Sequence, residues 1–329
     1  MIRFKGLLRL LSCCLLGLIL WGTTPAAQSS EIHSEIIHSK INSGTIKVVA
    51  TTSDLQSLVE AVGGTRVAAS SIALPAQDPH AFEPRLANLQ QLKGANLVVK
   101  IGLDHDLWFD KLLQETGNLE LQRGGKGYVD ASLGVPLLEV RSTTFAPTAG
   151  HNHGAGNPHY WLDPLNAQTM TGAIVEGLVK IDPDYADFYE ANRTAFLLEL
   201  DAKLTNWEQQ LAPFQGIPVI AYHNSWPYLA RRFRLKIIDY VEPKPGVPAS
   251  PTHLAALIRE IKAEHVSLVI KEPYEPEQIP KLLSKKTGAS VVTLVSSVGA
   301  LPAVEDYFAL FDYNVRTLAQ AFSQNLHDG

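Results

Sequence analysis

Short runs of β-branched residues alternate with amphipathic helical segments along most of this chain. The runs that predict strands are 46–51, 67–72, 96–101, 218–222, 236–241, 267–271 and 290–294. The segments that predict helices are 54–62, 85–93, 108–116, 251–263 and 276–286, the first capped by Thr52 or Ser53 and the fourth by Ser250. This alternation predicts an α/β architecture, in which mainly parallel sheets are flanked by helices.

One helical segment in the middle of the chain interrupts the alternation. It begins at Asp182-Pro183, ends near residue 211, and carries apolar residues at steps that place them on one face. These residues are Phe188, Phe196, Leu200, Leu204, Trp207 and Leu211. A helix of this length extends roughly 43 Å, which is long for a helix inside one domain. We therefore predict two α/β lobes, 46–182 and 213–329, joined by one long backbone helix at 183–212.

The N-terminus has the pattern of a secretory signal peptide. Three basic residues precede the apolar stretch 10–21, which is too short to span a bilayer permanently, and small residues follow at 24–27. We predict a signal peptide at 1–27, a polar disordered tether at 28–45, and a periplasmic protein. A lipoprotein cleavage at Cys13 is the alternative, but it would leave most of the apolar stretch behind the cleavage site. Both cysteines of the chain lie within the signal peptide.

Charge narrows the range of partners. Removal of residues 1–27 takes away three basic and no acidic residues, so the formal net charge moves from −5 to −8. An acidic protein is a poor ligand for nucleic acid. We therefore expect no nucleic-acid partner, and we expect a monomer.

Three histidines stand in turn-forming phrases at the ends of apolar runs. His80 and His159 each follow a proline, which favours an extended or turn conformation, and His223 follows the predicted strand 218–222. Imidazole is a natural ligand for zinc, but the three residues lie far apart in the chain, so only the fold can bring them together. In open α/β sheets, ligands bind near the carboxyl ends of the strands, and a site shared by both lobes would lie between them.

Several phrases of this sequence resemble those of the zinc/manganese solute-binding proteins of bacterial ABC transporters. They are Asp78–Pro84, Gly94–Val99, Asn157–Pro164, Tyr222–Tyr228 and Glu242–Gly246, and they occur in the order that the family has. The resemblance extends from about residue 46 to residue 322. It implies two α/β lobes joined by a rigid helix, a buried metal ion between the lobes, and delivery of that ion to a membrane permease. By position, it implies that His80, His159 and His223 are metal ligands.

The sequence departs from this family at one ligand position. The family commonly has an Asp shortly before a Gly in the last strand-to-helix loop, and Ser296 stands at this point here. A neutral hydroxyl is a poor ligand for a divalent metal ion. The fourth position is then filled by water or by a carboxylate such as Glu272, which alternatively accepts a proton from an imidazole ligand.

The other histidines and Asp163 have more ordinary interpretations. His151 and His153 lie in a glycine-flanked loop where some relatives in the family carry a longer histidine-rich insertion, so a weak role in metal capture is open for them. Asp163 precedes a proline, as a helix N-cap does. The remaining candidates, His105, His253, His265 and His327, stand in charged or helical contexts that are typical of a surface, and no role is predicted for them.

The sequence therefore predicts high-affinity capture of a divalent metal ion and its delivery to an ABC-transporter permease. Three imidazoles favour Zn²⁺, whereas a Mn²⁺ site would use more oxygen ligands. A manganese-binding member of the same family is the first alternative. A secreted zinc hydrolase is the second, because three histidines and a water also describe a catalytic zinc, but the sequence contains neither His-Glu-x-x-His nor Gly-x-Ser-x-Gly. We expect no enzymatic activity.

Overall fold

The computed structural model describes residues 44–75, 77, 82–140, 156–244 and 246–327. Its strands form two parallel four-stranded sheets. The first has the order β2-β1-β3-β4, with β1 at Ile46–Ala50, β2 at Val67–Ser71, β3 at Leu97–Lys100 and β4 at Tyr128–Asp130. The second has the order β6-β5-β7-β8, with β5 at Pro218–Ala221, β6 at Lys236–Tyr240, β7 at Leu268–Lys271 and β8 at Ser290–Thr293. The predicted fold class is confirmed.

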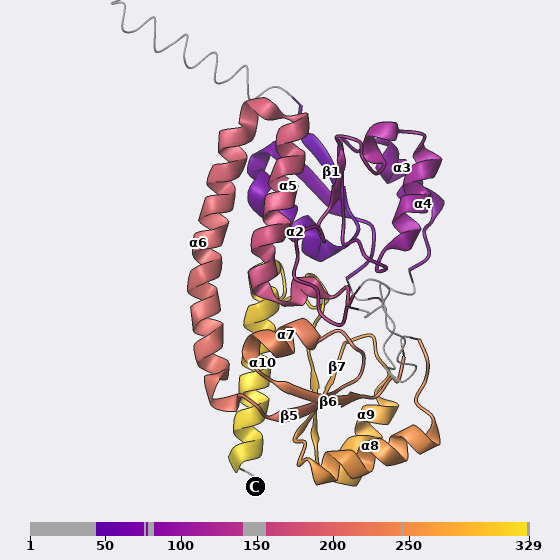
Figure 1. Ribbon diagram of the computed structural model, residues 1–329, viewed down its shortest axis with the longest axis vertical. Coiled ribbons are helices and arrows are strands. Elements are labelled where there is room, and N and C mark those ends of the chain that lie inside the picture. The colour runs from indigo at the N-terminus through magenta and orange to yellow at the C-terminus, as the bar shows by residue number, and fades with distance from the viewer. Residues whose placement is uncertain (1–43, 76, 78–81, 141–155, 245, 328–329) are drawn as a thin grey trace, which may run out of the picture. The chain divides into compact units, whose positions relative to one another are not determined.

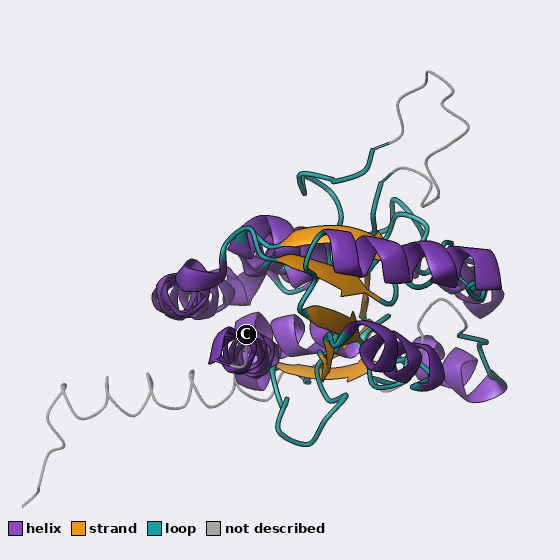
Figure 2. Ribbon diagram, turned by 90° about the horizontal axis from the view of Figure 1, so that it is seen from below, coloured by secondary structure: helices purple, strands orange, loops and turns teal. Residues whose placement is uncertain are grey.

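Helices cover both faces of each sheet (Figure 2). On the first sheet, successive residues of β1 point to opposite faces: Val48 packs with α2 (Ser53–Gly63) and α5 (Ala167–Ile181), and Val49 packs with α3 (Leu86–Lys93) and α4 (Leu107–Thr116). On the second sheet, α8 (Pro251–Ala263) and α9 (Gln278–Thr287) cover one face. The other face meets α7 (Pro227–Phe233) and α10 (Tyr307–His327). Burial on both faces explains why the inner strands β3, β5 and β7 read as nearly continuous apolar runs.

The long helix α6 (Ala186–Leu211) leads from the first sheet to the second, as predicted for a backbone helix (Figure 1). It packs against α5 near its start and against α10 further along. Its buried residues Phe196, Leu200, Trp207 and Leu211 join one apolar core that includes side chains from both sheets. None of the helices in the described part of the chain is both long enough and apolar enough to span a bilayer.

The start of this helix differs from the sequence prediction in two ways. Residues Pro183–Tyr185 form a separate 3-10 turn before α6, and Phe188, expected on the buried face, is 37% exposed. Tyr189 is buried instead, and its hydroxyl donates a hydrogen bond of 2.7 Å to Asp182. Asp182 also accepts from the guanidinium of Arg66, and this ion pair lowers the pKa of the Asp182 carboxyl.

The other elements show which signals of the sequence were sufficient. Ser250 and Thr52 cap α8 and α2 as predicted, and the predicted strands extend one or two residues beyond the observed ones. Four elements had no prediction: β4, α5, α7 and α10. β4 has only three residues, too few for a period to be visible.

Three hydrogen bonds join α2 of the first lobe to Val298, between β8 and α10, and to Tyr307, the first residue of α10. The Ser53 hydroxyl donates to the Val298 carbonyl at 2.7 Å, and the Val298 amide donates to the Asp54 carboxyl at 2.9 Å. The Tyr307 amide donates to the Ser57 hydroxyl at 3.0 Å. Asp54 is fully buried, and this burial raises its pKa to about 7.

Asp54→Asn should change how the stability of the protein depends on pH. A carboxyl whose folded-state pKa is raised binds its proton in the folded chain at pH values where the unfolded chain has lost it, so its contribution to stability falls as pH rises. Between pH 5.5 and 7.0 this loss is about 1.5 kcal/mol, and an amide cannot undergo it. Urea unfolding of both proteins across this range measures the difference. A difference that stays constant with pH would contradict the assignment.

Candidate metal centre

His159 lies in a short segment between β4 and α5 that is held by hydrogen bonds on the first-lobe side. A 3-10 turn at Tyr160–Leu162 follows it, and the histidine is 2% exposed. The Tyr160 hydroxyl donates to the carbonyl of Ile101 at 2.6 Å, and the Asn166 amide donates to the Tyr160 carbonyl at 2.8 Å. These bonds hold the turn against the end of β3, so the position of His159 is determined by the backbone around it.

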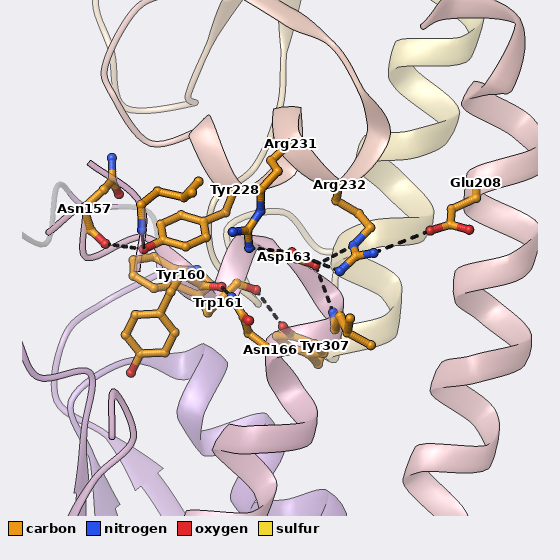
Figure 3. A network of polar contacts seen from close by, with 12 residues as sticks. Asn157, Tyr160, Trp161, Asp163, Asn166, Glu208, Tyr228, Arg231, Arg232 and Tyr307 are labelled. Atoms are coloured by element: carbon orange, nitrogen blue, oxygen red, sulfur yellow. Dashed lines mark hydrogen bonds and ion pairs between the residues drawn. The ribbon is translucent and has the colours of Figure 1, made fainter. Parts of the chain in front are cut away.

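The second lobe holds the same segment from the other side (Figure 3). The Tyr228 hydroxyl donates to the carbonyl of Asn157 at 2.8 Å, and the Tyr307 hydroxyl donates to the carbonyl of Trp161 at 2.6 Å. The Trp161 indole donates to the carbonyl of Ser296 at 2.8 Å. Both lobes therefore determine where His159 lies.

Asp163 closes this segment and does more than the predicted capping. Its carboxylate accepts from the Leu165 amide at 3.1 Å, which confirms the N-cap. It also accepts from the guanidinium groups of Arg231 at 3.1 Å and Arg232 at 2.8 Å, both on α7, and Arg232 lies 3.7 Å from Glu208 on α6 (Figure 3). The Asp163 side chain is almost completely buried, so these two cations compensate its charge.

His223 follows the last residues of β5 and is 7% exposed. Its Nδ1 lies 2.5 Å from a carboxylate oxygen of Glu242, the residue shortly after β6 that also accepts from the Gly246 amide at 2.7 Å. This contact favours a proton on Nδ1 and a lone pair on Nε2, the arrangement in which Nε2 can coordinate a metal ion. The sequence suggested that Glu272 accepts a proton from an imidazole ligand. For His223, Glu242 makes this contact instead.

The structure brings His159 and His223 together. Their ring centroids are 5.5 Å apart, and the ring planes are inclined at 76°. Two imidazoles that share one tetrahedral zinc at about 2.0–2.1 Å have centroids roughly 5 Å apart, so the spacing of this pair fits a shared metal ion. His80, His151 and His153 lie outside the described residues. Within the described ranges, no group of three histidine, cysteine, aspartate or glutamate side chains forms a metal-holding cluster.

A pair of carboxyl groups lies at the end of β7. Glu272 is fully buried, Glu275 is 7% exposed, and the Glu275 carboxyl accepts from the Glu272 amide at 2.6 Å. Burial of the Glu275 carboxyl is the main reason why its pKa lies well above its usual range, and the charge of Glu272 is the second reason. The Glu275 carboxyl therefore keeps its proton at neutral pH. A role of Glu272 as a metal ligand stays a prediction.

A cavity of about 610 Å³ borders His223. Its lining includes Tyr222, Glu242, Glu275 and Gln77, and Tyr274 lies in the same wall. Ser296, at the position where the resemblance implied an aspartate, is 6% exposed. Its hydroxyl brings no negative charge, so the acidic groups near His223 come from the ends of β6 and β7.

His105 was predicted at the surface, and this prediction is wrong. It is 3% exposed, and its ring lies against His159 at 5.8 Å and against Trp161 at 5.1 Å between centroids. It follows the carboxyl end of β3, as His223 follows β5. That shared position at the end of a parallel strand was a signal that could have identified it, but the charged neighbours Asp104 and Asp106 concealed it.

Known proteins resemble this chain over most of its length. Residues 48–321 match the family model described as zinc-uptake complex component A, periplasmic. The iron-binding protein YfeA of Yersinia pestis is 26% identical, over 84% of this chain and 86% of that protein. The manganese ABC transporter substrate-binding lipoprotein PsaA of Streptococcus pneumoniae is 24% identical, over 87% and 92%. A crystal structure of ZnuA superposes with a TM-score of 0.72 at 26% identity, over 84% of this chain and 99% of that one.

Proposed function

Because this chain belongs to the family of periplasmic zinc-uptake components of metal ABC transporters, we propose that it captures one Zn²⁺ ion between its lobes and delivers it to a membrane permease. The observation that carries the proposal is the pair of buried imidazoles, His159 from the first lobe and His223 from the second, at a spacing that fits one shared metal ion. His80 is proposed as the third ligand. Glu272 is proposed either to complete the coordination or to accept a proton from an imidazole.

The choice of zinc rests on the chemistry of the ligands. YfeA is named for iron and PsaA for manganese, so membership of the family does not select the metal. Imidazole nitrogen suits zinc, whereas manganese favours carboxylate, carbonyl and water oxygen. His223, with its Nδ1 on Glu242, is a nitrogen ligand made more basic by a carboxylate. A manganese-binding protein of the same family is the second candidate.

We also propose the absence of catalysis, the domain organisation, and the location and partners of the protein. The family consists of solute-binding proteins, and we propose binding without catalysis on the metal ion. We propose a signal peptide at 1–27, a tether at 28–45, lobes at 46–182 and 213–329, and a linking helix at 183–212. We further propose that the protein is a periplasmic monomer, that its partner is a membrane permease, and that it does not bind nucleic acid.

Purified protein should contain one tightly bound Zn²⁺, and a strong chelator should remove it. X-ray absorption spectroscopy of the reloaded protein should show mainly nitrogen neighbours at about 2.0–2.1 Å. Mainly oxygen neighbours would favour the manganese alternative. Hydrolysis of ester, amide or phosphate substrates that is lost with the metal would favour the hydrolase alternative instead.

A further inference from the structure

We propose that His105 is an additional ligand of the same metal ion, beside His159 and His223. The inference rests on the proposed metal-binding function and deepens it. Ser296, in the position expected to hold a carboxylate, is neutral. With His105 as a ligand, imidazole nitrogens dominate the metal site.

The geometry around His159 carries this inference. The His159 ring has His223 on one side, at 5.5 Å and 76°, and His105 at 5.8 Å and 90°. The second spacing is close to the first, and both are near the roughly 5 Å between imidazoles that share a tetrahedral zinc. All three histidines are at least nine-tenths buried. Imidazole nitrogens coordinate zinc, so three buried imidazoles at these spacings suit a shared metal ion.

The backbone before His105 turns the side chain inward. Gly102 has a positive φ of 78°, a conformation that glycine adopts without strain. The buried carboxylate of Asp106 then accepts from the amides of Ile101 at 2.8 Å and Gly102 at 3.1 Å, which folds the loop back onto the end of β3. The Asp106 carboxylate therefore supports the loop, and the His105 imidazole lies against Trp161 and His159.

Metal binding requires one local movement. Among the described residues, no three ligand side chains already form a metal-holding cluster, so the proposal includes a turn of the His105 ring toward the ion when it binds. A shell of neutral imidazoles leaves the charge of the ion uncompensated, and the carboxylate of Glu242 behind His223 supplies negative charge nearby. Such a shell discriminates against manganese, which favours oxygen ligands.

Two variants test this proposal. His105→Leu should weaken zinc binding by about 10–100-fold or more in a chelator competition, and X-ray absorption should show one imidazole fewer than in the parent protein. His105→Cys places a thiolate at the same position, so its Co²⁺ complex should show a sulfur-to-cobalt charge-transfer band that the parent protein does not have. The cysteine variant gives a positive signal even where the leucine variant folds poorly.

The matched control is His253→Gln on α8, because the His253 imidazole already bonds to the Tyr240 carbonyl at 2.8 Å and its loss should not affect the metal. An unchanged imidazole count in His105→Leu, together with no charge-transfer band in His105→Cys, would overturn the role of His105. If His159→Ala also bound zinc as tightly as the parent protein, the proposed function itself would be wrong.

Discussion

His223→Ala should weaken zinc binding by several orders of magnitude, and His159→Ala should do the same. Each substitution removes a nitrogen ligand from a buried site, and the remaining ligands cannot replace it because they are held on separate strands and turns of the two lobes. His80→Ala should have a comparable effect if His80 is the third ligand. Competition with a chelator of known affinity measures the loss in each variant.

Glu242→Gln should cause a smaller loss of affinity than these substitutions. It keeps the size of the side chain that holds His223 but removes the charge, so we expect a loss of about 10–100-fold in affinity. His265→Gln, at an exposed position, is the control and should leave affinity unchanged. Binding that stays at the parent level in both His159→Ala and His223→Ala would place the metal elsewhere.

Asp163→Ala should lower the free energy of unfolding of the metal-free protein by about 3–5 kcal/mol, because it leaves the guanidinium groups of Arg231 and Arg232 without their buried partner and removes a helix cap. The network around Asp163 joins the segment of His159 to α7 and reaches α6 (Figure 3). Urea denaturation followed by circular dichroism measures the change. We also expect weaker metal binding, because His159 lies in the same segment.

Glu208→Gln provides the comparison for this prediction. Glu208 lies 3.7 Å from Arg232 but is largely exposed, and exposed ion pairs contribute only about 0–1 kcal/mol. Asp163→Asn should fall between the two variants, since an asparagine can still cap the turn but carries no charge. If Asp163→Ala were as stable as Glu208→Gln, the buried ion pairs would not stabilise the fold.

Local features of this protein were accessible from the sequence alone. The caps of α2 and α8 depend on hydrogen bonds between residues three positions apart, so Thr52 and Ser250 could be identified directly. The inner strands β3, β5 and β7 were found because burial on both faces of a parallel sheet demands nearly continuous apolar runs. The backbone helix was found from its length and its apolar face. The family phrases pointed to His159 and His223, although their role as ligands stays a prediction.

Tertiary structure decided what depends on groups far apart in the chain. The contact of His223 with Glu242 and the pairing of Asp163 with Arg231 and Arg232 require neighbouring strands and helices to be in place, and no pattern in the sequence specifies them. His105 was predicted at the surface because the residues next to it in the sequence are charged. The sequence therefore determines elements through local hydrogen bonds and periodic burial, whereas the partner of a buried polar group depends on how the two lobes pack.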